Sequence, residues 1–177
     1  MCDIPGENEN TAYGCVFCLT GKEQTLAERI QALCPEVRTI TMRQMKYRTC
    51  KKTKYREEAI VLPGYVFFSA PTEIKPSDCF PKQDIIRILT SEKWHWQLMG
   101  EDEEFARWLF TYDGLLDFSK AYREGERIRI LSGPLKDLEG KITRIDKRGC
   151  SGQVILNFNG RSIPVWLGFE MVSPIEI

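Results

Sequence analysis

The sequence predicts an α+β protein, in which an N-terminal domain of strands and helices is followed by a small β-barrel. Up to about residue 112, segments of helical and of strand-like apolar spacing follow one another. From residue 122 onward, short alternating strands and turn glycines continue without helical periodicity. We therefore expect a disordered leader at 1–11, a first domain at 12–112, a linker at 113–121 and a second domain at 122–177.

The first domain opens with a strand and a helix. Residues 13–19 are apolar and rich in strand-forming types. Thr20 and Glu23 have the spacing of a capping box, in which the hydroxyl accepts from the N3 amide and the glutamate reaches back. One helical face follows at i, i+4 and i+7, with Leu26, Ile30 and Leu33. Pro35 ends the helix, because the residue before a proline is displaced from the helical region.

The charges of the chain, which sum to zero, are unevenly distributed, and residues 37–56 form a basic segment. They include eight basic residues and no acidic one, which leaves 17 basic against 25 acidic residues elsewhere. We expect a long hairpin here, and two interpretations stay open. The lysines protect a sheet edge, or the arm faces nucleic acid. The basic residues are Arg38, Arg43, Lys46, Arg48, Lys51, Lys52, Lys54 and Arg56.

The longest apolar run is 60–68, and its β-branched and aromatic residues predict a buried strand. Pro63 and Gly64 interrupt it, which indicates a strand start, an edge or a bulge, because proline donates no ladder hydrogen bond. We expect the protein's own helices to cover one face of this strand and a partner to cover the other. By alternation the two faces are Tyr65 with Phe67, and Val66 with Phe68.

The middle of the chain predicts one more strand and one more helix. Residues 70–81 contain three prolines and form an irregular connection, and 84–90 predict a short strand. Residues 101–112 predict a helix with four acidic residues in its first turn, where the helix dipole favours them. Its apolar stripe, expected to be core, is Phe105, Trp108, Leu109 and Tyr112.

Five short strands without a helix predict the barrel. Residues 127–131 and 141–145 are strand-like, with turn signals at Gly133-Pro134 and Gly140 between them. Asn159-Gly160 is the preferred sequence of a type I′ hairpin turn. The arms that flank this turn alternate through Val154, Leu156 and Phe158, and then through Ile163, Val165 and Leu167.

The composition argues against several classes of protein. No apolar run approaches the roughly 20 residues of a membrane-spanning helix, and the N-terminus lacks the features of a signal peptide. Seven cysteines without a framework indicate free thiols in a cytoplasm. Cys15 and Cys18 have no second pair to complete a zinc site, so we expect no metal and no cofactor. With His95 as the only histidine and no phosphate-binding loop, we expect no enzymatic activity.

Three motifs in order resemble the NusG family of transcription elongation factors. Residues 13–23 resemble the opening strand and helix entry of the family's N-terminal domain, and 62–67 (Leu-Pro-Gly-Tyr-Val-Phe) match its Pro-Gly-Tyr strand. Residues 126–146 match the KOW motif, including Gly133-Pro134 and Gly140. The resemblance covers 12–175 and implies a NusG-type α/β sandwich followed by an SH3-like KOW barrel.

The resemblance also implies partners. The family's N-terminal domain binds the clamp helices of the RNA polymerase largest subunit through an apolar concave face. Four of the matching residues could instead be simply interior, namely Cys15, Phe17, Tyr65 and Phe67. The full set that the resemblance places at this contact is Cys15, Phe17, Pro63, Gly64, Tyr65 and Phe67.

In the KOW domain, family members contact ribosomal protein S10 or the termination factor Rho. The resemblance assigns Leu138 to that contact, although Leu138 could equally cap the barrel. It further implies a bacterial, cytoplasmic protein, and we expect a monomer that does not associate with membranes.

Three departures separate the chain from housekeeping members. Gly14 stands where the family usually has a large residue. Residues 77–89 lack the Thr-Gly-Phe pattern common in housekeeping members, and residues 163–172 differ from the housekeeping sequence pattern. The last stretch is most similar to the LoaP branch, whose members are processive antiterminators. That similarity implies recognition of an RNA hairpin in the nascent leader. The basic face for this RNA, or alternatively a solvated face, would be Lys141, Arg144, Lys147, Arg148 and Arg161.

These patterns predict a transcription elongation or antitermination factor that suppresses pausing and termination. Its hairpin arm would contribute Arg43, Lys46 and Arg48 to nucleic-acid binding. The alternative within the family is a housekeeping factor of pausing and transcription–translation coupling. A ribosomal or RNA-maturation protein with a KOW barrel is the alternative from another class, although it would not need the Pro-Gly-Tyr strand.

Overall fold

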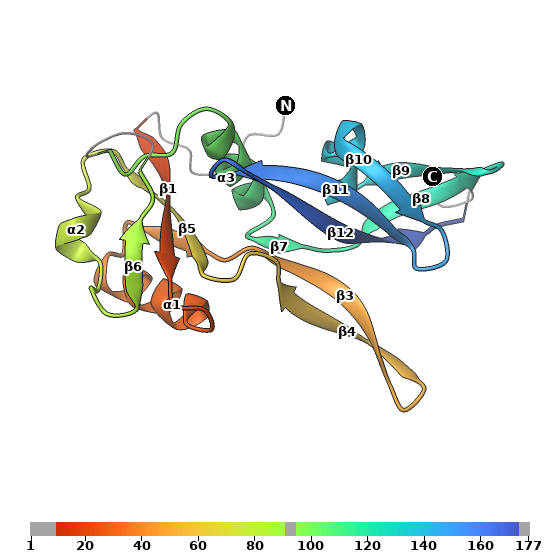
Figure 1. Ribbon diagram of the computed structural model, residues 1–177, viewed down its shortest axis with the longest axis horizontal. Coiled ribbons are helices and arrows are strands. Elements are labelled where there is room, and N and C mark those ends of the chain that lie inside the picture. Colours follow the sequence, from red (N-terminus) through yellow and green to blue (C-terminus); the bar gives the residue numbers. More distant parts are fainter. Residues whose placement is uncertain (1–9, 91–94, 174–177) are drawn as a thin grey trace. The chain divides into compact units, whose positions relative to one another are not determined.

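The computed structural model describes residues 10–90 and 95–173 (Figure 1). Antiparallel sheets are combined with a few helices, and the predicted α+β class is confirmed. Of the predicted leader at 1–11, the first nine residues lie outside the described part. None of the helices in the described part has the length and apolar character needed to cross a membrane.

The contacts divide the chain into two compact units. Unit 1 comprises Met1–Met42 and Leu62–Gly114, and unit 2 comprises Arg43–Val61 and Leu115–Ile177. The sequence-based boundaries kept 12–112 together because these residues are consecutive. In the structure, the basic hairpin groups with the barrel instead, since its aromatic and charged side chains contact barrel residues.

A four-stranded sheet forms the centre of unit 1, with the strand order β2-β5-β1-β6. Its strands are antiparallel, and Gly14 lies opposite Phe68 in the central pair. β5 begins directly after Pro63-Gly64, as expected of a strand start. The strands are β1 (Thr11–Cys18), β2 (Arg38–Ile40), β5 (Tyr65–Pro71) and β6 (Ile85–Ile88).

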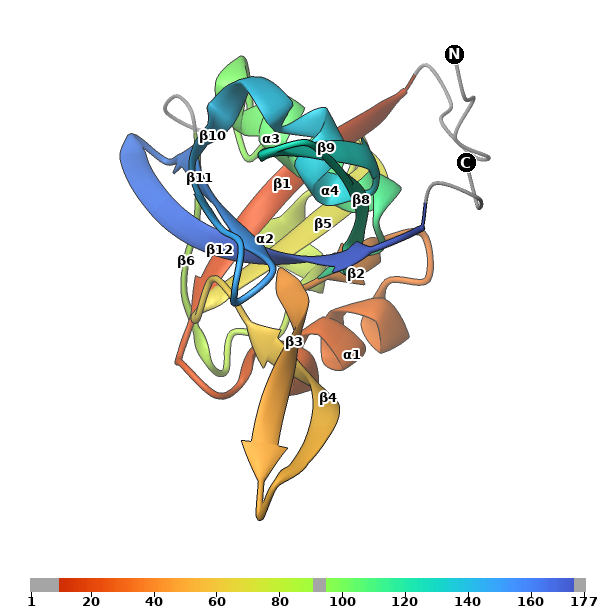
Figure 2. The same cartoon turned by 90° about the vertical axis from the view of Figure 1, so that its right-hand side faces the viewer.

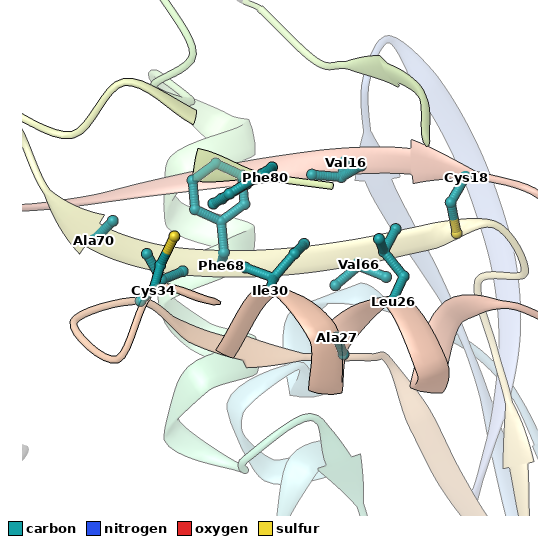
Figure 3. Close-up of a cluster of buried hydrophobic side chains, with 11 residues drawn as sticks. Val16, Cys18, Leu26, Ala27, Ile30, Cys34, Val66, Phe68, Ala70 and Phe80 are labelled. Carbon is teal, nitrogen blue, oxygen red and sulfur yellow. The ribbon is translucent and has the colours of Figure 1, made fainter. Parts of the chain in front are cut away.

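Helix α1 (Glu23–Leu33) covers one face of this sheet (Figure 3). Leu26 and Ile30 point at Val66 and Phe68, which confirms that alternate residues of β5 face opposite ways. Leu33 was predicted to lie on the same apolar face of the helix. It is 61% exposed, so the prediction that it packs with Leu26 and Ile30 is wrong. The helix ends at this residue, and buried Cys34 and Val37 complete the cluster instead.

Helix α3 (Glu101–Thr111) covers part of the opposite face. The ring of Phe105 lies 5.7 Å from that of Phe67, and both side chains are buried. Leu109 is also buried, whereas Trp108 and Tyr112 are half-buried at the margin of the predicted stripe. Helices of the protein itself therefore cover one face of β5 and the part of the other face around Phe67, so the expectation that a partner covers the whole second face is limited to the part around half-buried Tyr65.

Gly14 differs from the family pattern for a steric reason. A Cβ at Gly14 would overlap the ring of Phe68. That ring fills the space from the neighbouring strand, and it stacks on Trp96 at a centroid distance of 5.2 Å. The large residue typical of the family at position 14 is therefore excluded by another large residue at 68.

Glu23 joins two of the motifs that define the family resemblance. Its carboxylate is buried, with Oε1 accepting from the Gly64 N–H (2.6 Å) and Oε2 accepting from the Gly21 N–H (2.8 Å). The predicted capping box is wrong in its other half, because Lys22 precedes the helix and no side chain caps it. The glutamate reaches back as expected, but its second oxygen is committed to the Pro-Gly turn.

Unit 2 combines a five-stranded sheet, β10-β11-β12-β8-β9, with the smaller sheet β4-β3-β7. The five strands curve around a shared interior, and β3 and β4 extend from it as a two-stranded arm (Figure 2). The strands are β3 (Arg43–Cys50), β4 (Thr53–Ile60), β7 (Leu115–Leu116), β8 (Ser119–Glu124), β9 (Arg127–Ser132), β10 (Ile142–Asp146), β11 (Ser151–Phe158) and β12 (Arg161–Met171).

Several details of this unit differ from the expectation. The segment expected to be a linker, 113–121, contains β7 and the start of β8, which pair with β3 and β12. Two short helices, α4 (Pro134–Asp137) and η1 (Glu139–Lys141), occupy the stretch expected to hold only turns. In unit 1, the segment expected to be an irregular connection also contains a short helix, α2 (Pro76–Cys79). Ile60 is 43% exposed on the arm rather than buried in a strand with Phe68.

The hairpin turn at Asn159-Gly160 is confirmed. Phe158 pairs with Arg161, so the loop has two residues, and both have positive φ (51° and 68°) as a type I′ turn requires.

A glycine substitution at the Pro-Gly turn should be far more costly than one at Gly21. Both glycines have φ near +86°, but a Cβ at Gly64 would lie 2.8 Å from the Phe17 ring and 3.1 Å from the Cys18 carbonyl oxygen. At Gly21 nothing lies within 4 Å. We expect Gly21→Ala to cost about 1 kcal/mol of unfolding free energy and Gly64→Ala about 3 kcal/mol, measured by urea denaturation. Equal losses would show that the turn is not packed against Phe17.

Candidate functional site

The residues predicted to contact a partner differ in how deeply they are buried. Cys15 and Phe67 are fully buried beneath α3, as the interior alternative held. Phe17 and Tyr65 are half-buried, directly paired between β1 and β5, with ring centroids 5.0 Å apart. We call these two residues the aromatic pair. A surface contact in this region is therefore limited to the aromatic pair and its neighbours.

The Pro-Gly turn adjoins the aromatic pair. Pro63 is exposed, whereas Gly64 is buried and donates to Glu23 while its carbonyl accepts from the Cys18 N–H at 2.7 Å. Gly64 therefore acts by admitting the Phe17 ring close to the backbone rather than by touching a partner. The exposed Arg87 of β6 lies opposite Phe17, with its guanidinium 6.0 Å from the ring centroid. Arg87 was not predicted as a site residue, because only the strand pairing places it there.

The two free cysteines of β1, Cys15 and Cys18, present no accessible thiolate. Cys18 packs in the α1 cluster and Cys15 lies on the other face, as their spacing on a strand predicted. Burial, with smaller contributions from Asp102 and Cys18, raises the pKa of Cys15 well above its ordinary value. Burial, followed by Glu23 and Asp84, raises the pKa of Cys18 to about 11. Neutral thiols are poor metal ligands and poor nucleophiles. Among the described residues, no group of three or more acidic, cysteine or histidine side chains could hold a metal ion.

The basic arm has two unlike faces. Directly paired residues share a face, so Tyr47 and Arg56 lie on one side, and Arg48 and Tyr55 on the other. At its tip, Lys51 and Lys52 both have positive φ (47° and 70°). Most side chains avoid this conformation, and a two-residue turn of this kind favours asparagine and glycine. The backbone therefore holds two adjacent lysines at the exposed end of the arm.

One face of the arm is attached to the barrel. The Tyr47 ring stacks on Phe118 at 4.5 Å, and its hydroxyl donates to Glu170 Oε1 at 2.6 Å. Arg56 forms an ion pair with the same carboxylate and lies 5.2 Å from the Phe118 ring. The Tyr47 hydrogen bond and then Arg56 lower the pKa of Glu170 below its ordinary value. We call this set of contacts the Glu170 clasp.

The arm residues predicted to bind nucleic acid differ in how far their charge is neutralised. Arg43 pairs with Glu58 at 2.6 Å, and Arg48 pairs with Glu57 at 2.7 Å. Lys46 is half-buried, and no carboxylate of the described residues lies within ion-pair distance of it. The same holds for the exposed tip lysines, so the available positive charge concentrates toward the end of the arm.

The basic residues predicted on the barrel do not form one cluster. Lys147 is engaged, since its Nζ donates to the Glu126 carbonyl at 2.6 Å and lies 3.6 Å from that residue's carboxylate. Arg144 lies opposite Gln153, whereas Arg161 follows the turn beyond Phe158 at the other end of β11. Five residues of strand separate those ends by roughly 17 Å. Lys141 is in η1 and Arg148 is in the turn after β10, and both are exposed.

Leu138 is 7% exposed at the end of α4. This burial agrees with the alternative in which Leu138 caps the barrel. By contrast, Trp166 was not predicted as a site residue and is 42% exposed on β12. The alternation of buried Val165 and Leu167 around it would have indicated its outward orientation.

Comparison with known proteins gives relatives of one kind. No family model matches the chain. The chain is 38% identical over 52 residues to the transcription termination/antitermination protein NusG of Thermus thermophilus, a match spanning 29% of this chain and 28% of that protein. It is 29% identical over 135 residues to the protein of the same name from Borreliella burgdorferi, spanning 70% of this chain and 72% of that protein.

A solved structure on domain interaction in Thermotoga maritima NusG matches the chain with a TM-score of 0.50 and 18% sequence identity. The match covers 90% of this chain and 94% of that one, and it shows a shared fold. The names of the relatives and this shared fold support the resemblance of the chain to the NusG family.

Native thiol reactivity should separate the cysteines. At pH 8 we expect iodoacetamide to alkylate exposed Cys50 and to spare Cys15 and Cys18, with sites identified by mass spectrometry. A pKa of about 11 keeps Cys18 as a neutral thiol in the folded protein. An unfolded thiol ionises near its ordinary value of about 8.5, so urea should expose both buried sites to labelling. Rapid native alkylation of Cys18 would contradict its burial.

Loss of the carboxylate at Glu170 should loosen the arm without unfolding the barrel. Glu170→Gln keeps an acceptor for Tyr47 but removes the charge that pairs with Arg56, so hydrogen exchange should accelerate across 43–60. Because the pKa of Glu170 is lowered, its stabilisation exists above the ordinary carboxyl pKa and is lost as the pH falls. Glu124→Gln, which breaks the Arg129 ion pair on the barrel, is the control and should leave the exchange of the arm unchanged.

Proposed function

We propose that this chain is a NusG-like transcription factor that binds the RNA polymerase clamp helices and suppresses pausing and termination. The contact would be made by the aromatic pair, Phe17 and Tyr65, with exposed Pro63 beside it. Cys15, Gly64 and Phe67 would support this surface from beneath. The single observation that favours this proposal is that two directly paired aromatic rings stay half-buried at one end of the β1–β5 pair, whereas Phe67 on the same face is covered by α3.

The geometry of the aromatic pair suits a helical partner. Exposed aromatic side chains on a rigid strand lose little conformational entropy on binding and are enriched at the centres of interfaces. The pair is fixed by strand pairing and by the buried Glu23–Gly64 hydrogen bond, so it is preorganised. Arg87 beside Phe17 could contact an acidic residue of the partner at the rim of the interface.

We further propose that the factor belongs to the specialised antiterminator type and recognises a leader RNA hairpin. This part of the proposal is supported by cations that form no ion pair with a carboxylate of the described residues, namely Lys51 and Lys52 on the arm and Arg144 on the barrel. Arg43, Arg48 and Lys147 would contribute less, because carboxylates neutralise them. The buried Leu138 makes a contact with ribosomal protein S10 or Rho less favoured for this chain than for a member with an exposed residue there.

The test is multi-round transcription with purified bacterial RNA polymerase on a template with a terminator, with and without an upstream leader hairpin. Readthrough that depends on both the protein and the hairpin supports a targeted antiterminator. Altered pausing on every template supports a housekeeping factor of pausing and coupling. An absence of any effect on polymerase refutes the proposal.

Substitution of the aromatic pair should abolish the effect on polymerase without unfolding the protein. For Phe17→Ala with Tyr65→Ala we expect at least a tenfold loss of affinity for polymerase, since each half-buried ring contributes about 1 kcal/mol or more to an interface. Co-sedimentation with purified polymerase measures this affinity. Leu33→Ala is the matched control, because Leu33 is an exposed apolar residue at the end of α1, outside the aromatic pair. Equal binding by all variants would remove the assignment.

A further inference from the structure

On the outer surface of the barrel, Arg144 shares a row with two side chains, Gln153 and Trp166, that have so far been given no function. β11 pairs with β10 on one side and with β12 on the other. Arg144, which follows an irregularity in the β10 register, lies opposite Gln153, and Gln153 lies opposite Trp166. Directly paired residues of adjacent strands share a face, so all three side chains stand on the same side of the sheet. The inward side is occupied by buried residues, including Val154 and Leu167. Neighbouring strands lie about 4.8 Å apart, so the row spans roughly 10 Å.

Trp166 is a large apolar side chain that this chain leaves in solvent, with 42% of its surface exposed. On the same face, half-buried Ile155 and exposed Pro164 adjoin it through the β11–β12 pairing. On its other side along β12, the Phe118 ring occupies the space above Gly168, where a Cβ would overlap it. Across the β11 pairing, the neighbour of the indole is Gln153, and Arg144 lies beyond it on β10.

The charges along the row favour an anion. Arg144 is exposed, and no carboxylate of the described residues lies within ion-pair distance of it. Asp146, two residues along β10, has its Oδ1 engaged by the N–H groups of Arg148 and Gly149 at 3.0 Å. Glu170 on β12 is held by the Glu170 clasp. The Thr143 hydroxyl lies 3.2 Å from both the backbone oxygen and Oε1 of Gln153, and among the described residues no acceptor is bonded to the Gln153 amide N–H₂.

We propose that Trp166, Gln153 and Arg144 form a binding site for an unpaired RNA nucleotide. The indole stacks on the base, the Gln153 amide donates to a base-edge acceptor, and the guanidinium contacts the adjoining phosphate. An aromatic side chain on an open sheet surface suits splayed bases, whereas the narrow major groove of A-form RNA excludes it. This inference rests on the proposed RNA-binding function and names the part of the RNA, loop or bulge, that the barrel contacts.

The test measures binding of the chain to a fluorescein-labelled 12-nucleotide oligoadenylate by fluorescence anisotropy, with a blunt 12-base-pair RNA duplex as the second probe. Trp166→Leu keeps apolar bulk but removes the flat ring, and it should weaken oligoadenylate binding by about tenfold. Trp166→Phe should retain most of the affinity. Duplex affinity should change by less than about twofold, because stacking needs unpaired bases. Circular dichroism confirms that each variant is folded.

The salt dependence tests the role of Arg144. Arg144→Gln should reduce the slope of log affinity against log salt by about 0.7, as expected for one lost phosphate contact on a single strand. Arg127→Gln is the matched control, since Arg127 is exposed on β9 outside the row, and it should leave the slope unchanged.

Three results would overturn the inference: no oligoadenylate binding by the wild-type chain, unchanged binding by Trp166→Leu, or equal weakening of the duplex. If the wild-type chain still promotes readthrough in the transcription assay, only this site is refuted and the proposed function stands. If oligoadenylate binding depends on Trp166 but polymerase is unaffected, the site stands and the proposed function fails.

Discussion

The buried carboxylate of Glu23 is the interaction on which the candidate surface of unit 1 depends. It accepts hydrogen bonds from the backbone of Gly21 and of Gly64, so it ties the start of α1 to the turn before β5. A buried carboxylate needs such donors, because an unpaired charge in the interior is costly. Removing either donor would leave one oxygen of the carboxylate without its hydrogen bond. The strand–glycine–helix entry and the Pro-Gly-Tyr strand are thus parts of one hydrogen-bonded unit.

This constraint determines what the sheet can present. With the turn held, the Gly64 carbonyl accepts from the Cys18 N–H and the strand pair is fixed up to its end, where Phe17 meets Tyr65. α1 seals one face and α3 seals the part of the other face around Phe67. The accessible remainder is small and includes the aromatic pair and the exposed Ile86 and Arg87 of β6. A small rigid surface suits a contact with one helix pair better than with a large globular partner, because few side chains must be ordered on binding.

Local patterns predicted much of the fold, and long-range pairings account for what they missed. Alternation predicted which residues of β5 face α1, and Asn159-Gly160 predicted a hairpin, since both signals act within a few residues. The covering of Phe67 by Phe105 depends on a helix far along the chain, so a resemblance that placed Phe67 on a surface could not be corrected locally. The Glu170 clasp joins residues more than 100 positions apart, and no local pattern indicates it. The exposure of Leu33 depends on where the helix stops relative to the sheet.

The arm shows how the charge of a neutral chain is used. Its arginines are paired with Glu57, Glu58 and Glu170, and each pair fixes the arm to itself or to the barrel. Its tip has lysines in a conformation that costs about 1 kcal/mol or more for each residue. Protection of a sheet edge requires charge but not this strained turn, because asparagine and glycine would form it more favourably with lysines placed nearby. The backbone strain is understandable if two adjacent ammonium groups must project together from the end of a rigid arm. That arrangement favours the nucleic-acid interpretation of the arm over edge protection.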